Sequence, residues 1–340
     1  MEFVCKHNGK EGIRHYAFLC ILLFVCLFCI FSCSNTSNKE VACFAPKCDT
    51  LRIAFTGDIL LDRGVRKYIE RHDVDSLFMP EIDSVFAAND FVIGNLECPA
   101  TSIVSPINKH FIFRGEPDWL QALYVHGFTH LNMANNHSMD QGRQGLADTE
   151  KQIRNHGMIP LGYGTTIAES VKPMLISECP RKVYLITSLR VPSENWTYLD
   201  SVPCVSESDF STIEAQIDSL KRIDPKCFVI VMLHWGVEHV EVPSSYQVRD
   251  AHRLVQAGAD CIVGHHPHCL QTVETYKGVP IYYSIGNFIF DQKKPINTRT
   301  AILTAEITAD TAYFALLPAE IDNCVPRLII NAETGVSRIK

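Results

Sequence analysis

The chain has 340 residues, of which 46% are hydrophobic and 20% are charged, so it can bury a large core. This composition excludes a disordered or collagen-like polymer. The formal net charge is −7, and the Lys and Arg residues form no block. Nucleic acid is therefore excluded as the main partner, because phosphate backbones are bound by clustered basic side chains.

Residues 1–32 have the pattern of an export signal, with a basic start followed by the uncharged run 16–31. That run is shorter than the roughly 20 apolar residues of a membrane-spanning helix, which favours an export signal. A retained transmembrane anchor is the alternative. Ser32 followed by Cys33 resembles a bacterial lipoprotein signal, in which the cysteine becomes the lipidated N-terminus. A signal cut elsewhere is the other alternative. We expect an exported protein anchored to the bacterial membrane through Cys33, with residues 33–50 as a polar tether.

The cysteines indicate no zinc motif. Five of the 14 lie in or end the leader, and the other nine contain no Cys-x-x-Cys pair. In an exported chain Cys43 and Cys48 would form the easiest disulfide. Cys227 and Cys261 lie at or near predicted strand starts, where buried thiols are expected.

From residue 51 to 340 the sequence predicts one α/β domain, because short apolar runs alternate with amphipathic stretches. The predicted strands are 51–56, 91–94, 130–134, 227–233 and 261–264. The predicted helices are 117–126, 142–156, 209–223 and 246–257. Segments 173–189 and 272–290 are predicted as antiparallel additions, the second with a turn at Lys277-Gly278.

A polar cluster follows each of the five predicted strands. The clusters are Gly57-Asp58, Asn95-Leu96-Glu97, Asn135-Asn136-His137, His234-Trp235 and His265-His266-Pro267-His268. In an open sheet with right-handed crossovers, the carboxyl ends of neighbouring parallel strands lie along one edge, where ligands bind. We therefore expect the clusters to converge. Imidazole, carboxylate and amide donors suit one or two divalent ions such as Mn, Fe or Zn.

Each cluster also has a purely structural interpretation. A Gly-Asp pair after a strand is commonly a turn, Glu97 could cap a loop, and a single histidine such as His234 is commonly a core residue. Three imidazoles in four residues at 265–268 are costly to explain in that way. The coincidence of five clusters favours a metal site.

The body of the chain, about 51–326, resembles the bacterial capsule-synthesis family called CapA, the poly-γ-glutamate synthesis accessory proteins of the calcineurin-like metallophosphoesterase superfamily. The motifs that carry the resemblance occur in the family's order. They are Phe-Thr-Gly-Asp at 55–58 with Arg63, Asn-Leu-Glu at 95–97, Phe-Arg-Gly at 113–115, Ala-Asn-Asn-His-Ser-Met-Asp at 134–140, His-Trp-Gly at 234–236, Gly-His-His-Pro-His at 264–268 and Tyr-Ser-Ile-Gly-Asn-Phe at 283–288. The resemblance implies a four-layer α/β/β/α metallophosphoesterase-like sandwich with a metal centre at the strand ends.

The resemblance also implies roles for individual residues. Asp58 would be the first-strand ligand, and Glu97 would stand at the position of a bridging carboxylate. Asn136 would bind the second metal, and His137 would be the catalytic imidazole. The remaining ligands would be His234, His266 and His268, with His265 as a spare candidate.

Three more residues are candidates beside these ligands. Arg114 could bind a substrate phosphate or carboxylate as a bidentate fork, or it could form a surface ion pair. Asn95 and Asn287 could orient ligands through hydrogen bonds, although Asn287 could instead only shape a turn. Phosphoesterases usually have Asp-x-His at the first strand, whereas Asp58 is followed by Ile59 and Leu60. One ligand is therefore missing, Asp62 is a partial replacement, and a site with one metal or none is the alternative.

Two functional classes follow. One is a metal-dependent hydrolase acting on a phosphoester, or on an amide or ester bond of a capsule polymer, poly-γ-glutamate or polysaccharide, or of its lipid-linked precursor. The other is a non-catalytic component that binds the polymer within a membrane export or synthesis complex. Removing the leader, with its three Lys or Arg and two Glu, changes the charge from −7 to −8. This charge disfavours broad capture of a polyanion and so favours catalysis.

Overall fold

The computed structural model describes residues 49–192, 194–329 and 335–339. The predicted signal at 1–32, lipidation site Cys33 and cysteine pair Cys43 and Cys48 lie outside these residues, as does nearly all of the tether at 33–50. Among the residues described, no helix has the length and apolar character that crossing a membrane requires.

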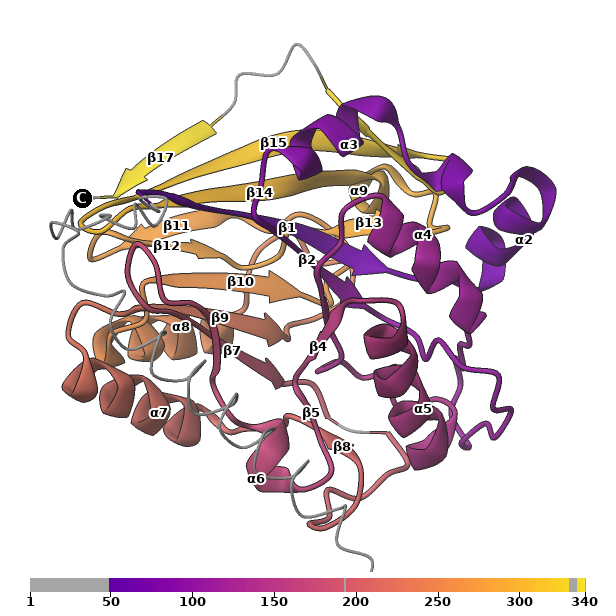
Figure 1. The fold of residues 1–340 in the computed structure, drawn as a ribbon, viewed down its shortest axis with the longest axis horizontal. Helices are drawn as coiled ribbons and strands as arrows, with labels where there is room; N and C mark the ends of the chain where they lie inside the picture. Colours follow the sequence, from indigo (N-terminus) through magenta and orange to yellow (C-terminus); the bar gives the residue numbers. More distant parts are fainter. Residues whose placement is uncertain (1–48, 193, 330–334, 340) are drawn as a thin grey trace, which may run out of the picture. The chain divides into compact units, whose positions relative to one another are not determined.

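Two large sheets form the centre of the protein (Figure 1). The nine-stranded sheet has the order β16 (Val325–Leu328), β15 (Ala312–Asp322), β14 (Arg299–Ile307), β1 (Leu51–Ile59), β2 (Phe91–Leu96), β3 (His130–Asn132) and β4 (Ile159–Leu161), with β13 (Asn287–Ile289) on β1 and β17 (Gly335–Ile339) on β15. The six-stranded sheet has the order β11 (Val273–Tyr276), β12 (Val279–Tyr282), β10 (Cys261–His265), β9 (Phe228–His234), β7 (Val183–Leu189) and β6 (Met174–Ser177). A small third sheet pairs β5 (Tyr163–Gly164) with β8 (Cys204–Val205).

Helices cover the outer face of each large sheet. The nine-stranded sheet carries α2 (Arg63–His72), α3 (Pro80–Ala87), α4 (Leu120–Val125) and α5 (Gly142–Asn155), and the six-stranded sheet carries α7 (Phe210–Ile223) and α8 (Ser245–Ala257). The remaining short helices are α6 (Ile167–Ser170), α9 (Pro295–Thr298) and the 3-10 turns η1 (Asp75–Leu77) and η2 (Pro117–Trp119).

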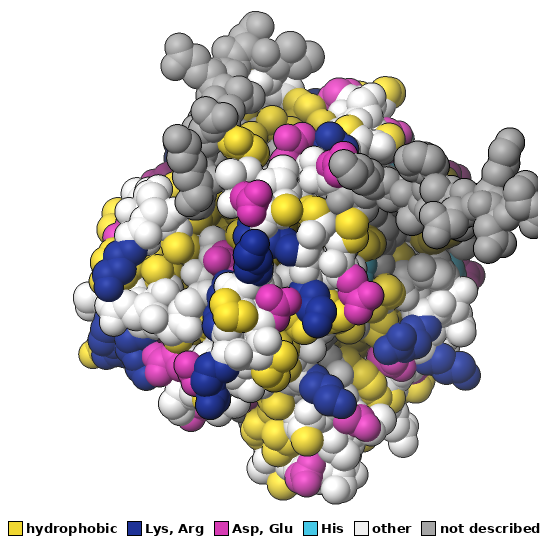
Figure 2. Space-filling view, turned by 60° about the vertical axis from the view of Figure 1, so that its left-hand side comes forward, with side chains coloured by type: hydrophobic (Ala, Val, Ile, Leu, Met, Phe, Trp, Pro, Cys, Tyr) yellow, Lys and Arg dark blue, Asp and Glu magenta, His cyan; other side chains and the backbone are white. Residues whose placement is uncertain are grey.

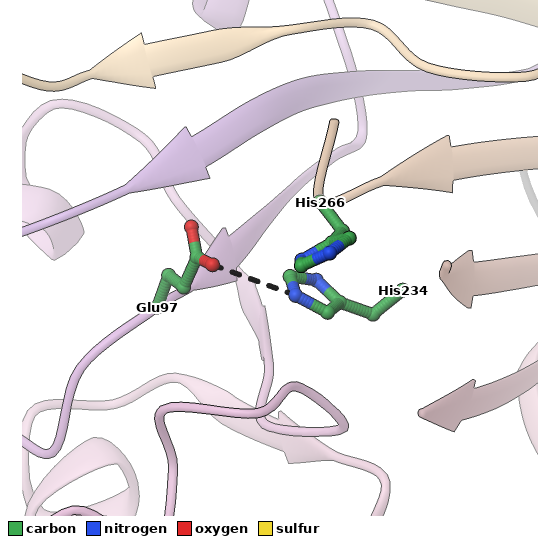
Figure 3. Close-up of side chains that lie close together, drawn as sticks. All are labelled: Glu97, His234 and His266. Atoms are coloured by element: carbon green, nitrogen blue, oxygen red, sulfur yellow. Dashed lines mark ion pairs between the residues drawn. The ribbon is translucent and has the colours of Figure 1, made fainter. Parts of the chain in front are cut away.

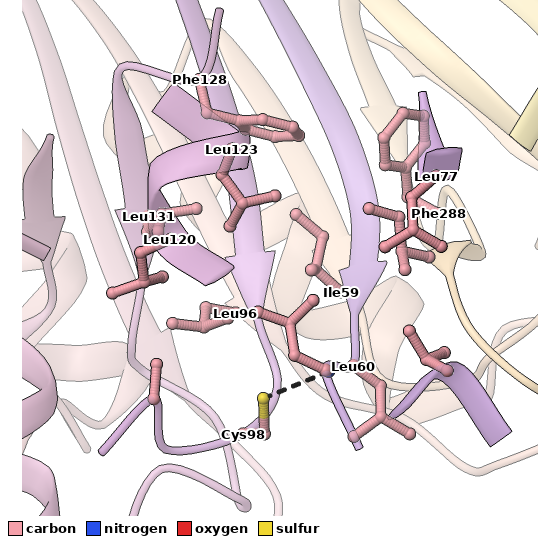
Figure 4. Close-up of a cluster of buried hydrophobic side chains, with 14 of the residues drawn as sticks. Ile59, Leu60, Leu77, Leu96, Cys98, Leu120, Leu123, Phe128, Leu131 and Phe288 are labelled. Atoms are coloured by element: carbon pink, nitrogen blue, oxygen red, sulfur yellow. Dashed lines mark hydrogen bonds between the residues drawn. The ribbon is translucent and has the colours of Figure 1, made fainter. Parts of the chain in front are cut away.

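Three apolar clusters fill the three spaces between the four layers. Ile53 and Phe55 of β1 face Ile230 and Met232 of β9 in the space between the sheets. The opposite faces of the strands pack against helices, as Figure 4 shows for part of the cluster beneath α4. The central strands are thus buried on both faces, which explains why they are continuous apolar runs. The predicted α/β/β/α sandwich is confirmed.

The predicted elements are largely present, with three corrections to the topology. The five strands do not share one sheet, since β1, β2 and β3 belong to one and β9 and β10 to the other. Within 173–189, β6 is antiparallel as predicted, but β7 runs parallel to β9 inside the sheet. Within 272–290, β11 and β12 form the predicted hairpin, whereas β13 crosses to the other sheet and runs parallel to β1. Cys227 and Cys261 are buried thiols, as predicted.

Local sequence explains the ends of the helices. The Asp209 side chain accepts a hydrogen bond from the backbone N–H of Thr212 and begins α7. Ser244 and Gln247 form a reciprocal capping box at the start of α8, and Gly258 ends it in the left-handed conformation. These caps satisfy backbone groups that a helix leaves unpaired at its ends.

Candidate metal centre

The five polar clusters meet where the carboxyl ends of the two sheets adjoin. Asp58 lies in β1, Glu97 follows β2, and Asn136 follows β3 in the nine-stranded sheet. His234 ends β9, and the 265–268 cluster begins at His265, the last residue of β10, in the six-stranded sheet. All these side chains are buried. The convergence predicted for one sheet edge is therefore produced by two sheets.

A close backbone approach positions Asp58. Its N–H donates to the carbonyl of Gly286 at 3.1 Å, and β1 is irregular between Phe55 and Asp58. A Cβ atom on Gly57 would lie 2.1 Å from that carbonyl oxygen, so only glycine fits. Gly57 and Asp58 are thus part of a strand and do not form a turn. The pairing of this strand with β13 places Asn287 opposite Asp58.

Two groups of three side chains have the geometry of metal sites, and they share one residue. Glu97, His234 and His266 form the first group, and Asp58, Glu97 and His268 form the second. Within each group the candidate ligand atoms lie within 4.8 Å of one another. Figure 3 shows the Glu97 carboxylate facing the imidazoles of His234 and His266, with 3.4 Å between Glu97 Oε1 and His234 Nε2.

Several buried polar atoms of this cluster have no hydrogen-bond partner among the residues described. They are both carboxylate oxygens of Glu97 and the Nδ1 atoms of His265 and His266. Glu97 is 0% exposed, so bulk solvent does not reach these oxygens. A buried polar atom without a partner is unfavourable unless a ligand binds it. These buried, unpartnered carboxylate and imidazole atoms therefore suit divalent cations as ligands.

The backbone of the histidine loop is strained. His266 has a φ of 94° and His268 a φ of 54°. Left-handed backbone costs a residue with a Cβ about 1 kcal/mol or more, and such strain concentrates at functional sites. Within the 265–268 cluster, the two strained residues are the two whose imidazoles belong to the ligand groups.

Burial and mutual charge set the protonation of the cluster. Burial raises the pKa of Glu97 well above its usual value. Burial also lowers the pKa of His234 far below its usual value and that of His266 to about 3, which keeps both rings neutral with a lone pair to offer. Burial opposes the charged form of His268, but Glu97 and Asp58 outweigh it and raise its pKa to about 10.

Amide side chains hold these groups in place. Asn136 Oδ1 lies 2.7 Å from His234 Nε2, where an amide oxygen could join the first group. Asn95 Nδ2 donates to Asp58 Oδ1 at 2.8 Å and also contacts His234 Nδ1. Asn287 Oδ1 lies 2.9 Å from His268 Nδ1. Asn95 and Asn287 therefore contact candidate ligands, and their role in orienting a ligand stays a prediction.

His265 lies beside the centre and belongs to neither ligand group. Its Nε2 contacts the carbonyl of Thr56 at 3.1 Å, an arrangement that places the ring proton on that nitrogen. Asp62 does not replace the missing first-strand ligand. It caps α2 by accepting from the Arg63 N–H, and it also accepts from Arg66 and from the Arg114 N–H.

His137 lies next to the centre and is held by an acid. Its Nδ1 is 2.7 Å from Asp140 Oδ2, and its ring stacks on Phe113 with 4.2 Å between centroids. Burial lowers the pKa of His137, and Asp140 partly offsets the effect. If Nδ1 donates to the carboxylate, Nε2 is left to accept or hold a proton.

A buried lysine that the sequence does not single out completes this arrangement. The Lys109 side chain is 1% exposed, and its Nζ donates to the carbonyl of Asn136 at 2.7 Å and to Asp140 Oδ1 at 3.2 Å. Its position in the long segment between β2 and α4 gives no periodic signal. Asp140 stands in the 134–140 motif, three residues after His137, and that spacing was the available clue.

Arg114 does not present a free fork to the centre. Its guanidinium forms two hydrogen bonds with the Glu116 carboxylate, at 3.1 and 2.6 Å, and a third with the carbonyl of Thr101. The ion-pair alternative therefore describes this side chain. Trp235 forms a wall, since its indole N–H donates to the carbonyl of Tyr283 and its ring is buried.

Comparisons with known proteins agree with these motifs. The family model described as bacterial capsule synthesis protein PGA_cap matches residues 52–292. The PGA biosynthesis protein CapA of Bacillus subtilis is 29% identical, over 94% of this chain and 84% of its own length. The capsule biosynthesis protein CapA of Bacillus anthracis is 30% identical, over 96% of this chain and 81% of its own length.

Two more distant similarities complete the comparison. A probable polyglutamine synthesis accessory protein of Mycobacterium tuberculosis is 29% identical, over 60% of this chain and 56% of its own length. Among solved structures, the sulfate thiohydrolase SoxB of Thermus thermophilus in complex with glycerol has a TM-score of 0.43 and 10% identity. That similarity covers 86% of this chain and 57% of the SoxB chain.

Proposed function

The chain belongs to the bacterial capsule synthesis protein family PGA_cap, and from this premise we propose that it is an envelope-anchored, metal-dependent hydrolase of capsule biosynthesis. The bond broken is a phosphoester, or an amide or ester bond of the capsule polymer or its lipid-linked precursor. Poly-γ-glutamate is the polymer that we favour, because relatives of the chain are named for its synthesis. Polymer and membrane export or synthesis subunits are then its partners.

One observation carries the proposal: Glu97 belongs to both ligand groups, and its two buried oxygens have no other partner among the residues described. Asp58 and His268 would hold one ion, His234 and His266 would hold the other, and Glu97 would serve both. Carboxylate and imidazole donors suit Mn, Fe or Zn. When bound, such ions supply Lewis-acid activation of water and of the oxygen on which charge develops.

The side chains around the centre supply the proton chemistry. Asp140 fixes the ring of His137, which leaves Nε2 to deliver a proton to the leaving group. Lys109 and the Phe113 N–H both donate to Asp140 and hold its carboxylate in place. Each member of this chain of contacts is buried, so water competes little with it.

Metal analysis tests the centre. We expect purified protein to contain one or two transition ions per chain, and the double variant His266→Ala with His268→Ala to lose them. His252→Ala is the matched control, because this imidazole on α8 pairs with Glu274 and belongs to neither ligand group. Equal metal content in the wild type and the double variant would refute the metal centre.

Turnover tests the hydrolase. We expect His137→Ala to keep its metal but to lose hydrolysis of a model phosphodiester or a γ-linked glutamyl peptide. The competing function is a non-catalytic component that binds polymer in the export complex. It would be supported if the wild type cleaved neither substrate while His137→Ala still restored a capsule-deficient strain.

Cell fractionation tests the location. The membrane anchor is proposed at Cys33, outside the residues described. We expect Cys33→Ser to release the protein from membranes, whereas Cys29→Ser, in the same leader, should leave it attached. Retention of the Cys33→Ser protein would favour a spanning leader over lipidation.

A further inference from the structure

A cavity of about 700 Å³ opens beside the metal centre. It lies between α2, the segment that follows β13 and the turn from β15 to β16. Its charged lining residues are Arg63, Lys67, Arg71, Lys293, Asp291 and Asp322. Four Lys or Arg side chains face two carboxylates, so the cavity carries a net charge of +2 in a chain whose net charge is −7.

Most of this positive charge is not neutralised by the protein. Arg63 pairs with Asp291, and Asp322 lies 3.7 Å from Arg327, outside the lining. Lys67, Arg71 and Lys293 form no ion pair within the described part of the chain, and all three are exposed. By contrast, the face in Figure 2 shows acidic and basic side chains interspersed. The cavity thus offers three free cations to an anionic ligand.

Two aromatic rings connect the cavity to the centre. The Arg63 guanidinium carbon lies 5.4 Å from the centroid of the Phe113 ring and 5.7 Å from that of the Phe290 ring. Phe113 stacks on His137, and the Phe290 and His268 centroids are 4.8 Å apart.

A hydrogen bond makes a second connection. Gln292 lines the cavity and accepts from Asn287, which itself contacts His268. One layer of side chains therefore separates the cavity from the ligand groups.

We propose that this cavity binds consecutive carboxylates of an acidic polymer whose reacting bond lies at the metal centre. The proposal rests on the proposed function and adds a substrate subsite to it. A chain that is negative overall must capture a polyanion locally. Arg114, the sequence's candidate for that task, is occupied by Glu116, whereas Lys67, Arg71 and Lys293 are free. Because two of these cations lie on α2 and the third on the segment after β13, the cavity presents several charges to a ligand with repeated carboxylates.

Binding of a defined polymer tests the cavity. The probe is fluorescein-labelled γ-linked polyglutamate, measured by fluorescence anisotropy with added Mn²⁺ and again with EDTA. We expect the triple variant Lys67→Ala, Arg71→Ala and Lys293→Ala to bind about 10-fold more weakly, the effect of losing three exposed ion pairs of ordinary strength. Added salt should weaken binding to the wild type and reduce the difference in affinity between the wild type and the triple variant.

The matched control removes the same charge elsewhere. Lys151, Lys172 and Lys226 are exposed, line no part of the cavity and form no ion pair with any described residue. Their triple alanine variant should bind the probe as the wild type does. Equal weakening by both variants would show that overall charge governs binding, and unchanged binding by the cavity variant would overturn the proposal.

Two further measurements separate the outcomes. The cavity variant should keep the metal content of the wild type, because none of its residues belongs to a ligand group. A protein without metal would contradict the proposed function, yet the EDTA measurement would still report on the cavity. Polyphosphate of equal charge is the second probe. If polyphosphate binds more tightly than polyglutamate and the cavity variant weakens that binding, the ligand of the cavity is a phosphate polymer and the carboxylate proposal is overturned.

Discussion

Replacing the shared carboxylate by its neutral isostere, Glu97→Gln, separates a metal ligand from a structural ion pair. In the metal-free protein, Asp58 and Glu97 face one charged imidazole, His268, at 3.2 and 3.7 Å. Burial raises the pKa of Glu97 well above its usual value, which favours the neutral acid in the metal-free protein, and glutamine resembles that form in shape and charge. Asp58 remains as the partner of His268. The substitution should therefore change little until metal is added.

A metal ligand and a structural ion pair predict different changes in the free energy of unfolding. As an isosteric change of a neutral group, Glu97→Gln should alter the free energy of unfolding of the metal-free protein by less than about 1 kcal/mol. Breaking a buried structural ion pair would instead cost about 3–5 kcal/mol. Metal at 100 times its Kd stabilises the wild type by about 2.7 kcal/mol per site, or roughly 4 °C in Tm for a chain of this size. If the variant binds 100-fold more weakly, that gain falls to about 0.4 kcal/mol.

Thermal unfolding in EDTA and in excess Mn²⁺ or Zn²⁺ measures both quantities. Wild type and Glu97→Gln should unfold together in EDTA and separate in metal. Glu274→Gln is the control. Glu274 lies outside the ligand groups and pairs with His252, with 2.8 Å between the two side chains, so this variant should keep the full stabilisation by metal. If Glu97→Gln is strongly destabilised in EDTA and shifts with metal as the wild type does, the carboxylate is structural.

Three further substitutions test the surroundings. Asp140→Asn should keep its metal but lower turnover by about 10²- to 10⁴-fold, since the amide no longer holds the His137 proton on Nδ1; turnover at the wild-type rate would exclude that role. Burial lowers the pKa of His130 to about 4 from about 6.5 when unfolded, so stability that is complete above pH 6.5 is lost as the pH falls towards 4. At pH 5 this one group accounts for a loss of about 2 kcal/mol, so between pH 7.5 and pH 5 His130→Leu should lose about 2 kcal/mol less stability than the wild type when urea unfolding is measured in EDTA; an identical loss in the two proteins would contradict this assignment. Gly57→Ala would place a methyl 2.1 Å from the Gly286 carbonyl oxygen, so it should destabilise by more than about 1 kcal/mol and lower the metal content; unchanged Tm and metal content would show that the strand accommodates it.

The sequence points to the candidate ligand residues because each one lies at or just after the carboxyl end of a buried strand. It does not reveal that these strands belong to two sheets. A strand buried on both faces is a continuous apolar run in either sheet, so β1 and β9 look alike in sequence. Only the long-range pairing of β1 with β14 and of β9 with β7 separates them. The four layers were implied by resemblance and not by periodicity.

Other features that the sequence does not reveal also depend on tertiary contacts. The pattern predicts no helix over α2, because only Val65 and Ile69 of its ten residues are buried. Lys109 lies in a segment without periodicity, where a lysine is expected to be exposed. Its burial results from Asp140 and the carbonyl of Asn136, which tertiary structure brings to it. For Arg114 the partner stood two residues away, but sequence alone does not show whether the pair closes.

The unfavourable features of this fold are concentrated at one point. Two histidines in left-handed backbone cost roughly 1–3 kcal/mol each, and the buried oxygens of Glu97, which have no hydrogen-bond partner among the residues described, cost a similar amount. Together these are a substantial part of the 5–15 kcal/mol that stabilises an ordinary domain. An apolar or hydrogen-bonded replacement at each position would remove the cost if the cluster served only the fold. Bound cations would offset this cost, since they would bind the Glu97 oxygens and the His266 ring, whose Nδ1 has no partner among the residues described. On this proposal the strained backbone of His266 and His268 aims one ring into each ligand group, which a loop selected only for stability would not require.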